Sequence, residues 1–202
     1  MEHNHLINST DRQLVNRVLA GDKAAFGLLI RNTERLVAQI VTRMIPNPED
    51  RKDKAQDIYL KAYKSLPSFQ FDAKLSTWIA RISYNACLDE LRKKKLVFPD
   101  NLPGGEEDYG QLPPDDSVFA GGRSADDLLL RKDLSGILQA AMEQLPPVYK
   151  TLVALYHQEE MSYEEIGNIT GLPGGTVKSY LFRARKALKN YLLRHYKKAD
   201  LW

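Results

Sequence analysis

Residues 174–188 carry hydroxyl groups and cations at a spacing that can bind nucleic acid. At helical periodicity these side chains fall on one side of the segment or next to it: Thr176, Lys178, Ser179, Arg183 and Lys186. The Arg183 guanidinium can donate two hydrogen bonds to a guanine edge, and the lysines and Ser179 can hold phosphates. The segment predicts a short helix for the major groove of duplex DNA. The alternative is an ordinary amphipathic helix with a solvated basic face.

Residues 69–95 hold a second set of nucleic-acid-binding side chains, in which aromatic rings alternate with cations. The set comprises Phe69, Phe71, Trp78, Arg81, Tyr84, Asn85, Arg92 and the lysines 93–95. Rings along a basic groove suit single-stranded nucleic acid, because every base offers a face for stacking. The amide of Asn85 can bond the edge of an unstacked base. The alternatives are a core position for Trp78 and a helix C-terminus stabilised by the basic run.

The sequence contains no recognisable catalytic motif. No phosphate-binding loop, zinc-ligand pattern or nucleophile elbow is present, and no strand precedes the glycines of 171–175. His3 and His5 have no cysteine or further histidine near them, and we expect them in a frayed terminus. The sequence therefore predicts a protein that is not an enzyme, without a cofactor, a metal ion or a small-molecule substrate.

The basic face of 174–188 must be positioned by a helix and a turn that precede it. Ser162 and Glu165 form the capping-box pattern at the start of the first helix. Gly171 suits a left-handed C-cap, and Pro173 suits the start of the second helix. The apolar residues expected to be buried are Ile166, Ile169, Val177, Leu181, Ala184 and Leu188. The pattern predicts a helix-turn-helix.

The aromatic and basic set of 69–95 needs a helical scaffold of its own. Apolar residues at helical spacing predict four helices, over 11–19, 23–45, 49–65 and 75–95, the first capped by Asp11. Pro46, Pro48 and Pro67 punctuate the chain between the later helices. Residues 8–95 are therefore expected to form a compact four-helix unit.

The remaining chain divides into a linker and a second helical unit. Residues 96–123 lack periodicity and are rich in proline, glycine and acids, which is typical of a flexible linker. Helices over about 124–144 and 147–157, followed by the helix-turn-helix, predict a unit that spans 124–196. The expected fold is all-α, with two small helical domains joined by the acidic linker.

Charge and composition restrict the classes of protein that fit. The net charge is only +3, but the charges are segregated along the chain. Residues 162–202 hold eight basic and three acidic residues, whereas residues 96–127 hold one basic and eight acidic residues. Such segregation suggests an interaction surface and a separate acidic tether. Cys87 is the single cysteine, so no intramolecular disulfide can form. We see no signal peptide or membrane-spanning run, and expect a soluble cytoplasmic protein.

Two long stretches resemble the extracytoplasmic-function (ECF) sigma factors of bacterial RNA polymerase. Region 2 of that family is similar to KAQDIYLKAYKSLPSFQFDAKLSTWIARISYNACLDELRKKK, and region 4 is similar to LPPVYKTLVALYHQEEMSYEEIGNITGLPGGTVKSYLFRARKAL. Together with the acidic linker, the resemblance covers nearly the whole chain. The ordered pair is far more specific than either stretch alone, and the short linker favours this group over the larger housekeeping sigma factors.

The resemblance implies a transcription initiation factor that binds core RNA polymerase, directs it to promoters and helps to open the DNA. Region 4 would recognise the duplex −35 element through Thr176, Lys178, Ser179, Phe182, Arg183 and Lys186. Region 2 would capture the unpaired −10 strand through Trp78, Arg81, Tyr84, Asn85 and Arg92. Gln56, Asp57 and Lys61 would face the clamp helices of the polymerase. The linker would occupy the RNA path, and an anti-sigma factor is an implied partner.

The chain departs from the family pattern in the helix-turn-helix. Pro173 stands where the family usually has a serine-like cap, Tyr180 where it often has arginine, and Phe182 where it often has histidine. One cation fewer should reduce the salt dependence of DNA binding by about one phosphate contact. The competing hypothesis is a stand-alone helix-turn-helix regulator, which leaves the aromatic and basic set of 69–95 without a role.

Overall fold

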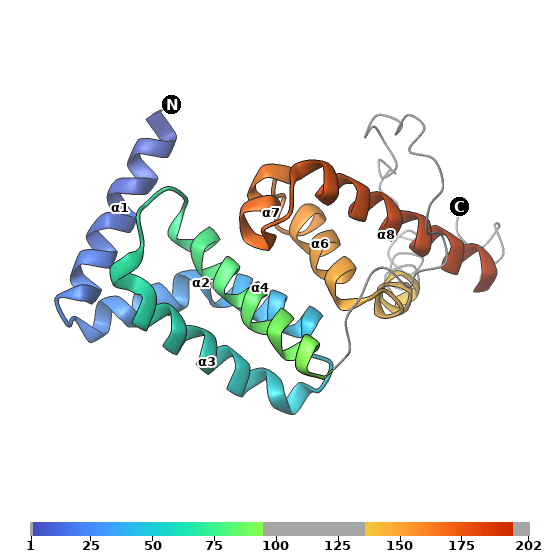
Figure 1. The fold of residues 1–202 in the computed structure, drawn as a ribbon, viewed down its shortest axis with the longest axis horizontal. Helices are drawn as coiled ribbons and strands as arrows, with labels where there is room; N and C mark the ends of the chain where they lie inside the picture. The colour runs from blue at the N-terminus through green and yellow to red at the C-terminus, as the bar shows by residue number, and fades with distance from the viewer. Residues whose placement is uncertain (1, 95–135, 196–202) are drawn as a thin grey trace, which may run out of the picture.

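The computed structural model describes residues 2–94 and 136–195, whose regular structure is entirely helical (Figure 1). The first unit comprises α1 (Glu2–Leu19), α2 (Lys23–Met44), α3 (Pro48–Ser65), the short 3-10 helix η1 (Leu66–Ser68) and α4 (Leu75–Lys93). The second comprises the helical residues 136–143, α6 (Pro147–His157), α7 (Tyr163–Thr170) and α8 (Gly174–His195). The predicted all-α fold is confirmed. The predicted linker, 96–123, lies outside the described residues. The expected end of the first unit at residue 95 and the expected start of the second unit at residue 124 also lie outside them.

Local capping explains why α2 and α3 begin at or next to their expected positions. The carboxylate of Asp22 accepts a hydrogen bond from the backbone N–H of Ala25 at 3.0 Å and caps α2. Asn47 caps α3 in the same way, and Pro48 occupies the first turn of that helix. These positions carry strong start signals in the sequence.

The start of α1 differs from its expected position. The helix begins at Glu2, so Asp11 lies inside it, and the backbone at His3 and His5 is helical. Asp11 instead accepts a hydrogen bond from the backbone N–H of Leu75 at 2.8 Å. The predicted cap of α1 is therefore wrong, and the side chain caps α4, which is distant in sequence.

The helix-turn-helix forms from the signals that predict it. The capping box of Ser162 and Glu165 is complete, and Gly171 ends α7 in the left-handed region at φ 75°. The carbonyl of Pro173 accepts the first hydrogen bond of α8, from Val177 N–H, at 3.0 Å. The predicted inner face is buried through Ile166, Ile169, Val177, Leu181 and Ala184, whereas Leu188 is only partly buried.

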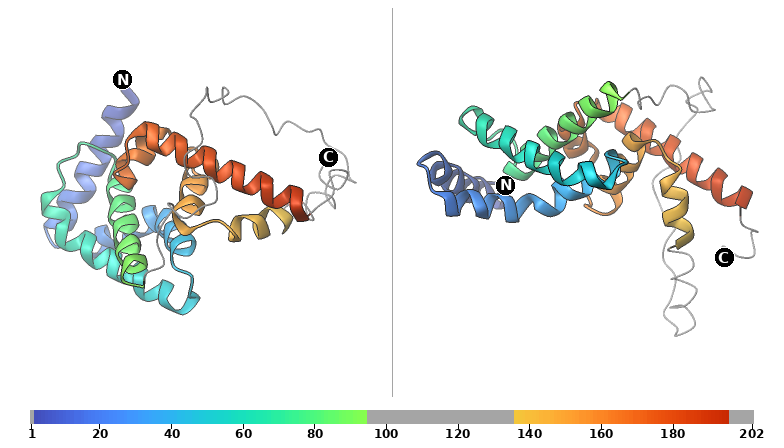
Figure 2. Two further views of the ribbon diagram at one scale, coloured as in Figure 1. Left: turned by 45° about the vertical axis from the view of Figure 1, so that its right-hand side comes forward. Right: turned by 90° about the horizontal axis from the view of Figure 1, so that it is seen from below.

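The two units pack directly against each other, which was not predicted. Helix α7 lies against α4 and α6 lies against α2 (Figures 1 and 2). One apolar core runs through both units. Ion pairs join Arg35 to Glu159 at 2.8 Å and Lys74 to Glu165 at 3.4 Å. The helix-turn-helix therefore covers part of α4.

Burial of ionisable groups in α4 predicts a loss of stability in alkali. Burial raises the pKa of the Cys87 thiol to about 12 and that of the Tyr84 phenol to about 12. From pH 9 upward the unfolded chain loses the thiol proton while the folded chain keeps it. Stability should be unaffected well below pH 9 and should then fall by about 1.4 kcal/mol per pH unit because of the thiol; the phenol of Tyr84 should add a similar slope only above pH 10, where an unfolded tyrosine ionises. Urea unfolding at pH 8 and pH 10 measures this slope.

Cys87→Ala supplies the matched control, because it removes the thiol but leaves Tyr84 in place. Its stability should fall less steeply between pH 9 and pH 10 than that of the unaltered chain. The single thiol should also react with a thiol reagent only after unfolding. Equal slopes, or rapid labelling of the folded protein, would show that Cys87 is not held in a buried site.

Candidate nucleic-acid interface

The outer side of α8 presents the predicted duplex-binding residues. Lys178 and Lys186 are exposed, and Phe182 lies between them with 42% of its surface exposed. Residues four apart follow one line along a helix, so these three side chains form one edge. The remaining candidates, Thr176, Ser179 and Arg183, are half-buried. The structure thus places the set on the side opposite the buried face of the helix.

The hydroxyls and cations of this face are not all equally available. The Ser179 Oγ donates a hydrogen bond to the carbonyl of Gly175 at 2.9 Å. Arg185 lies over the ring of Tyr156, with its guanidinium carbon 5.3 Å from the ring centroid. The basic surface therefore depends most on Lys178 and Lys186, with Arg183 beside them.

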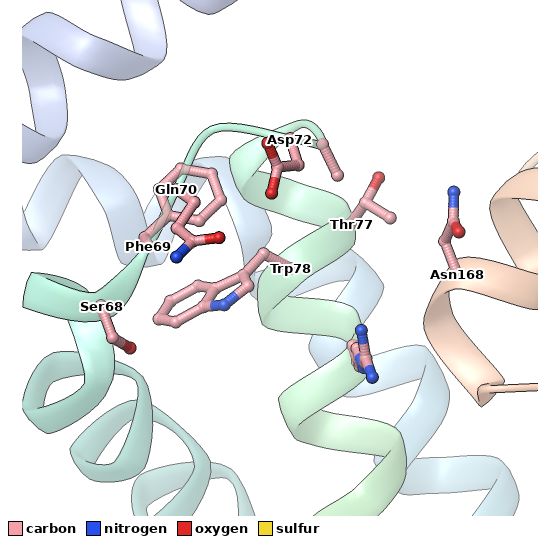
Figure 3. A pocket seen from close by; sticks show the side chains of 9 residues that line it. Ser68, Phe69, Gln70, Asp72, Thr77, Trp78 and Asn168 are labelled. Carbon is pink, nitrogen blue, oxygen red and sulfur yellow. The ribbon is translucent and has the colours of Figure 1, made fainter.

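A pocket lies beside the N-terminal half of α4, with a volume of about 250 Å³ (Figure 3). Its lining comes from the loop before α4, from α4 itself and from α7: Ser68, Phe69, Gln70, Asp72, Ala73, Thr77, Trp78, Arg81 and Asn168. The indole of Trp78 is half-buried and its ring centroid lies 5.1 Å from that of Phe69. Trp78 therefore both packs on the core and forms a wall of the pocket, so the two interpretations made for it are compatible.

The other predicted strand-binding residues of α4 divide into exposed and buried ones. Arg81, Asn85 and Arg92 are exposed. Tyr84 is only 3% exposed, and its burial, with a further contribution from the nearby Tyr180, raises its pKa to about 12. In the packed arrangement Tyr84 cannot offer its ring to a base. This part of the predicted interface is therefore buried, and Tyr180 of the second unit lies near it.

Part of the basic run at the end of α4 has a structural role. Lys94 pairs with Asp50 at 2.9 Å and with Glu90 at 3.3 Å, and Glu90 also pairs with Lys54 at 3.1 Å. These contacts tie the C-terminus of α4 to α3 and lower the pKa of Glu90. Lys94 thus has a structural role through ion pairs, which is a different cause from the helix dipole of the alternative interpretation, whereas Lys95 lies outside the described residues.

The outer face of α3 combines polar and apolar side chains. The predicted polymerase-facing residues Gln56, Asp57 and Lys61 are all exposed. Leu60 and Tyr63 are also exposed, at 58% and 48%. An exposed apolar centre with a polar rim is typical of a protein–protein interface. We refer to Gln56, Asp57, Leu60, Lys61 and Tyr63 as the α3 face.

Several of these residues were not singled out from the sequence. The pocket residues Gln70, Asp72 and Thr77 lie in or beside a loop without periodicity, and Asn168 comes from the other unit. The one sequence feature that could have pointed to these pocket residues is the pair of aromatic residues Phe69 and Phe71, which flank the polar Gln70. Leu60 was missed because it does not lie on the face of α3 that packs on the core. A leucine on the outer face of a helix is itself a signal of an interface.

Residues 2–94 and 136–195 contain no cluster of three metal-ligating side chains. Over the same ranges, no helix is both long enough and apolar enough to span a membrane.

Family models match both units of the chain. The model described as Sigma-70 region 2 matches residues 29–97, and the model described as Sigma-70, region 4 matches residues 135–188. The ECF RNA polymerase sigma factor SigW of Bacillus subtilis is 32% identical over 182 residues, which cover 90% of this chain and 96% of that protein. The ECF RNA polymerase sigma-E factor of Escherichia coli is 34% identical over 185 residues, covering 90% and 93%.

Solved structures share the fold. CnrH, in complex with the cytosolic domain of CnrY, aligns with a TM-score of 0.61 at 22% identity over 92% of this chain and 99% of that one. The sigma factor RpoE of Bartonella quintana, in complex with the anti-sigma factor NepR, aligns with a TM-score of 0.56 at 21% identity over 85% and 98%. At these identities the comparison supports the arrangement of helices.

Proposed function

Because the chain belongs to the ECF sigma factors of RNA polymerase, we propose that it binds core RNA polymerase and directs it to specific promoters. The observation that carries this proposal is the presence in one chain of both sigma regions, each with a surface suited to its task. A stand-alone regulator would use the helix-turn-helix but not the α3 face or the pocket. The chain would act in the cytoplasm, where the polymerase transcribes DNA.

The outer side of α8 would recognise the −35 element as duplex DNA. Lys178 and Lys186 would contact phosphates, and Arg183 would reach a base edge from its half-buried position. Phe182 offers an apolar surface that can meet a thymine methyl group.

The pocket beside α4 would hold a base of the unpaired −10 strand. Extruding a base costs a few kcal/mol, which stacking and edge contacts must offset. Trp78 supplies a ring for stacking, and Gln70 and Asp72 supply hydrogen-bonding groups for a base edge. Arg81 and Asn85 are exposed along the same helix and would contact the backbone or a neighbouring base.

Use of this interface would require the two units to separate. Asn168 of α7 lines the pocket, and Tyr84 is covered. An unpaired strand that follows α4 needs the space that α7 occupies. RpoE is bound to an anti-sigma factor in its solved complex. An anti-sigma factor of this chain would bind one or both of its two units.

The α3 face would bind the polymerase. Leu60 and Tyr63 would form its apolar centre, and the remaining polar members of the face would surround them. Tyr63 is fixed by an edge-on contact with Phe26, whose ring centroid lies 5.0 Å away. A side chain held in place loses less entropy on binding.

Loss of a cation from α8 should weaken −35 binding and its dependence on salt. Lys186→Ala should reduce the slope of log affinity against log salt by about 0.9, the value for one lost phosphate contact. Arg183→Ala should weaken −35 binding by a larger factor, because a good contact to a base edge contributes about 1–3 kcal/mol. Fluorescence anisotropy of a duplex −35 probe with the holoenzyme, between low and moderate salt, measures both the affinity and its salt dependence.

Lys23→Ala is the matched control, since Lys23 is an exposed lysine at the start of α2. It should leave the slope unchanged. If Lys186→Ala also leaves it unchanged, that residue does not contact a phosphate. If Arg183→Ala retains full promoter activity, Arg183 does not belong to the contact set.

Association with core polymerase distinguishes the two functions. The purified chain and core enzyme should elute together in size-exclusion chromatography, and tight, sequence-specific binding to promoter duplex should require both. A chain that ignores the polymerase but binds a specific duplex tightly on its own would be the stand-alone regulator.

A further inference from the structure

Residues 69–74 form the loop that makes one wall of the pocket, and contacts within this loop hold it only weakly. Lys74 occupies the N-cap position of α4 but makes no side-chain cap, and its ammonium group pairs with Glu165 of α7 instead. Phe71 lies at φ 62°, a conformation that is uncommon for a residue with a side chain. Such a backbone persists only where surrounding contacts hold it. We call residues 69–74 the pocket loop.

Helix α1 supplies a contact at the α4 end of this loop. The Asp11 Oδ2 accepts a hydrogen bond from the backbone N–H of Leu75 at 2.8 Å. Leu75 is the first residue of α4, so a carboxylate from another helix satisfies a backbone donor there and complements the positive end of the helix dipole. This bond fixes where the loop stops and α4 starts.

The next residue of α1 supplies a contact at the middle of the loop. The guanidinium carbon of Arg12 lies 4.7 Å from the ring centroid of Phe71, which is a cation–π distance. Phe71 in turn packs on Phe69 at 4.6 Å between ring centroids, and Phe69 packs on Trp78 at 5.1 Å. A continuous series of rings therefore leads from Arg12 to the wall of the pocket.

We propose that Asp11 and Arg12 are positioning residues that set the shape of the pocket loop, and through it the base that the pocket accepts. Both side chains lie outside the pocket lining, and they act on Gln70 and Asp72 through the backbone and the ring series. The proposal rests on the proposed role of the pocket in binding an unpaired base. It extends the set of specificity-determining residues from α4 to α1.

Selection of single strands by the holoenzyme tests this proposal. The probe is a pool of short single-stranded oligonucleotides of random sequence, which are bound to the assembled holoenzyme, recovered and sequenced. The unaltered chain should prefer one base strongly at one position. Asp11→Ala should reduce that preference about fivefold, the ratio expected for a lost N-cap, and leave the other positions unchanged. Arg12→Ala should act in the same direction.

Two variants separate positioning from general damage. Asp11→Asn keeps an oxygen that can accept from Leu75 N–H, so it should restore most of the preference. Gln13→Ala changes an exposed neighbour on α1 and should have no effect. Arg12 is itself exposed, so Arg12→Ala decides the question if Asp11→Ala disturbs folding.

The outcomes distinguish this proposal from the function on which it rests. Full base preference in both Asp11→Ala and Arg12→Ala would overturn the positioning role and leave the pocket function intact. An unaltered holoenzyme without preference at any position would overturn the pocket function, and the positioning role with it. Loss in both variants, with recovery in Asp11→Asn, supports the positioning role.

Discussion

Replacing Trp78 by alanine should strongly reduce promoter opening while the holoenzyme still forms and still binds the duplex −35 element. In the proposed function, the half-buried indole beside Phe69 is the stacking surface for the base. Stacking of one base contributes about 1–3 kcal/mol, so its loss should lower the open fraction by about 5-fold to 150-fold. Permanganate reactivity of unpaired thymines in the holoenzyme–promoter complex measures this fraction.

Two further variants show whether the loss comes from stacking or from damage to the fold. Trp78→Phe keeps a ring and should retain part of the opening activity. Asn85→Ala alters an exposed side chain and should spare the closed complex while it impairs opening. An equal loss of duplex binding and opening in these variants would indicate that the residues support structure and do not meet the strand.

Replacing Leu60 by aspartate should strongly weaken binding to core RNA polymerase without loss of stability. Leu60 is 58% exposed in the free chain, so a charge there stays hydrated and leaves the unfolding midpoint unchanged. In the complex, the same carboxylate would be removed from water without a partner, and residues at interface centres often account for 2 kcal/mol or more. The dissociation constant should rise by about 30-fold or more.

Leu19→Asp is the matched control for this substitution. Leu19 is also an exposed leucine, at 49%, but it ends α1 and lies outside the α3 face. Titration of fluorescently labelled chain with core polymerase should therefore distinguish the two variants. Normal affinity in Leu60→Asp, or an equal loss in Leu19→Asp, would remove the α3 face from the polymerase interface.

The parts of the fold that local sequence determines were predictable. The helix-turn-helix corner follows from Ser162, Glu165 and Gly171, because a capping box and a left-handed C-cap need only neighbouring residues. The start of α3 follows from Asn47 and Pro48 for the same reason. These contacts span a few residues, so the sequence order reveals them.

The parts that depend on distant contacts were not predictable from spacing. Asp11 looks like a cap for its own helix, but it meets Leu75, and nothing in its neighbourhood specifies that partner. Tyr84 was predicted to face the unpaired strand, yet it is 3% exposed in the packed chain, with Tyr180 of α8 nearby. The pocket loop has no periodicity, so Gln70 and Asp72 acquire meaning only once the loop is placed beside Trp78.

Reconstituted transcription tests the central claim most directly. The purified chain is mixed with core RNA polymerase and fragments of genomic DNA, and the starts of all transcripts are mapped. A sigma factor should produce specific starts that require this chain and share two sequence elements upstream. Starts that do not depend on the chain, together with tight duplex binding by the chain alone, would contradict the account and identify a stand-alone regulator.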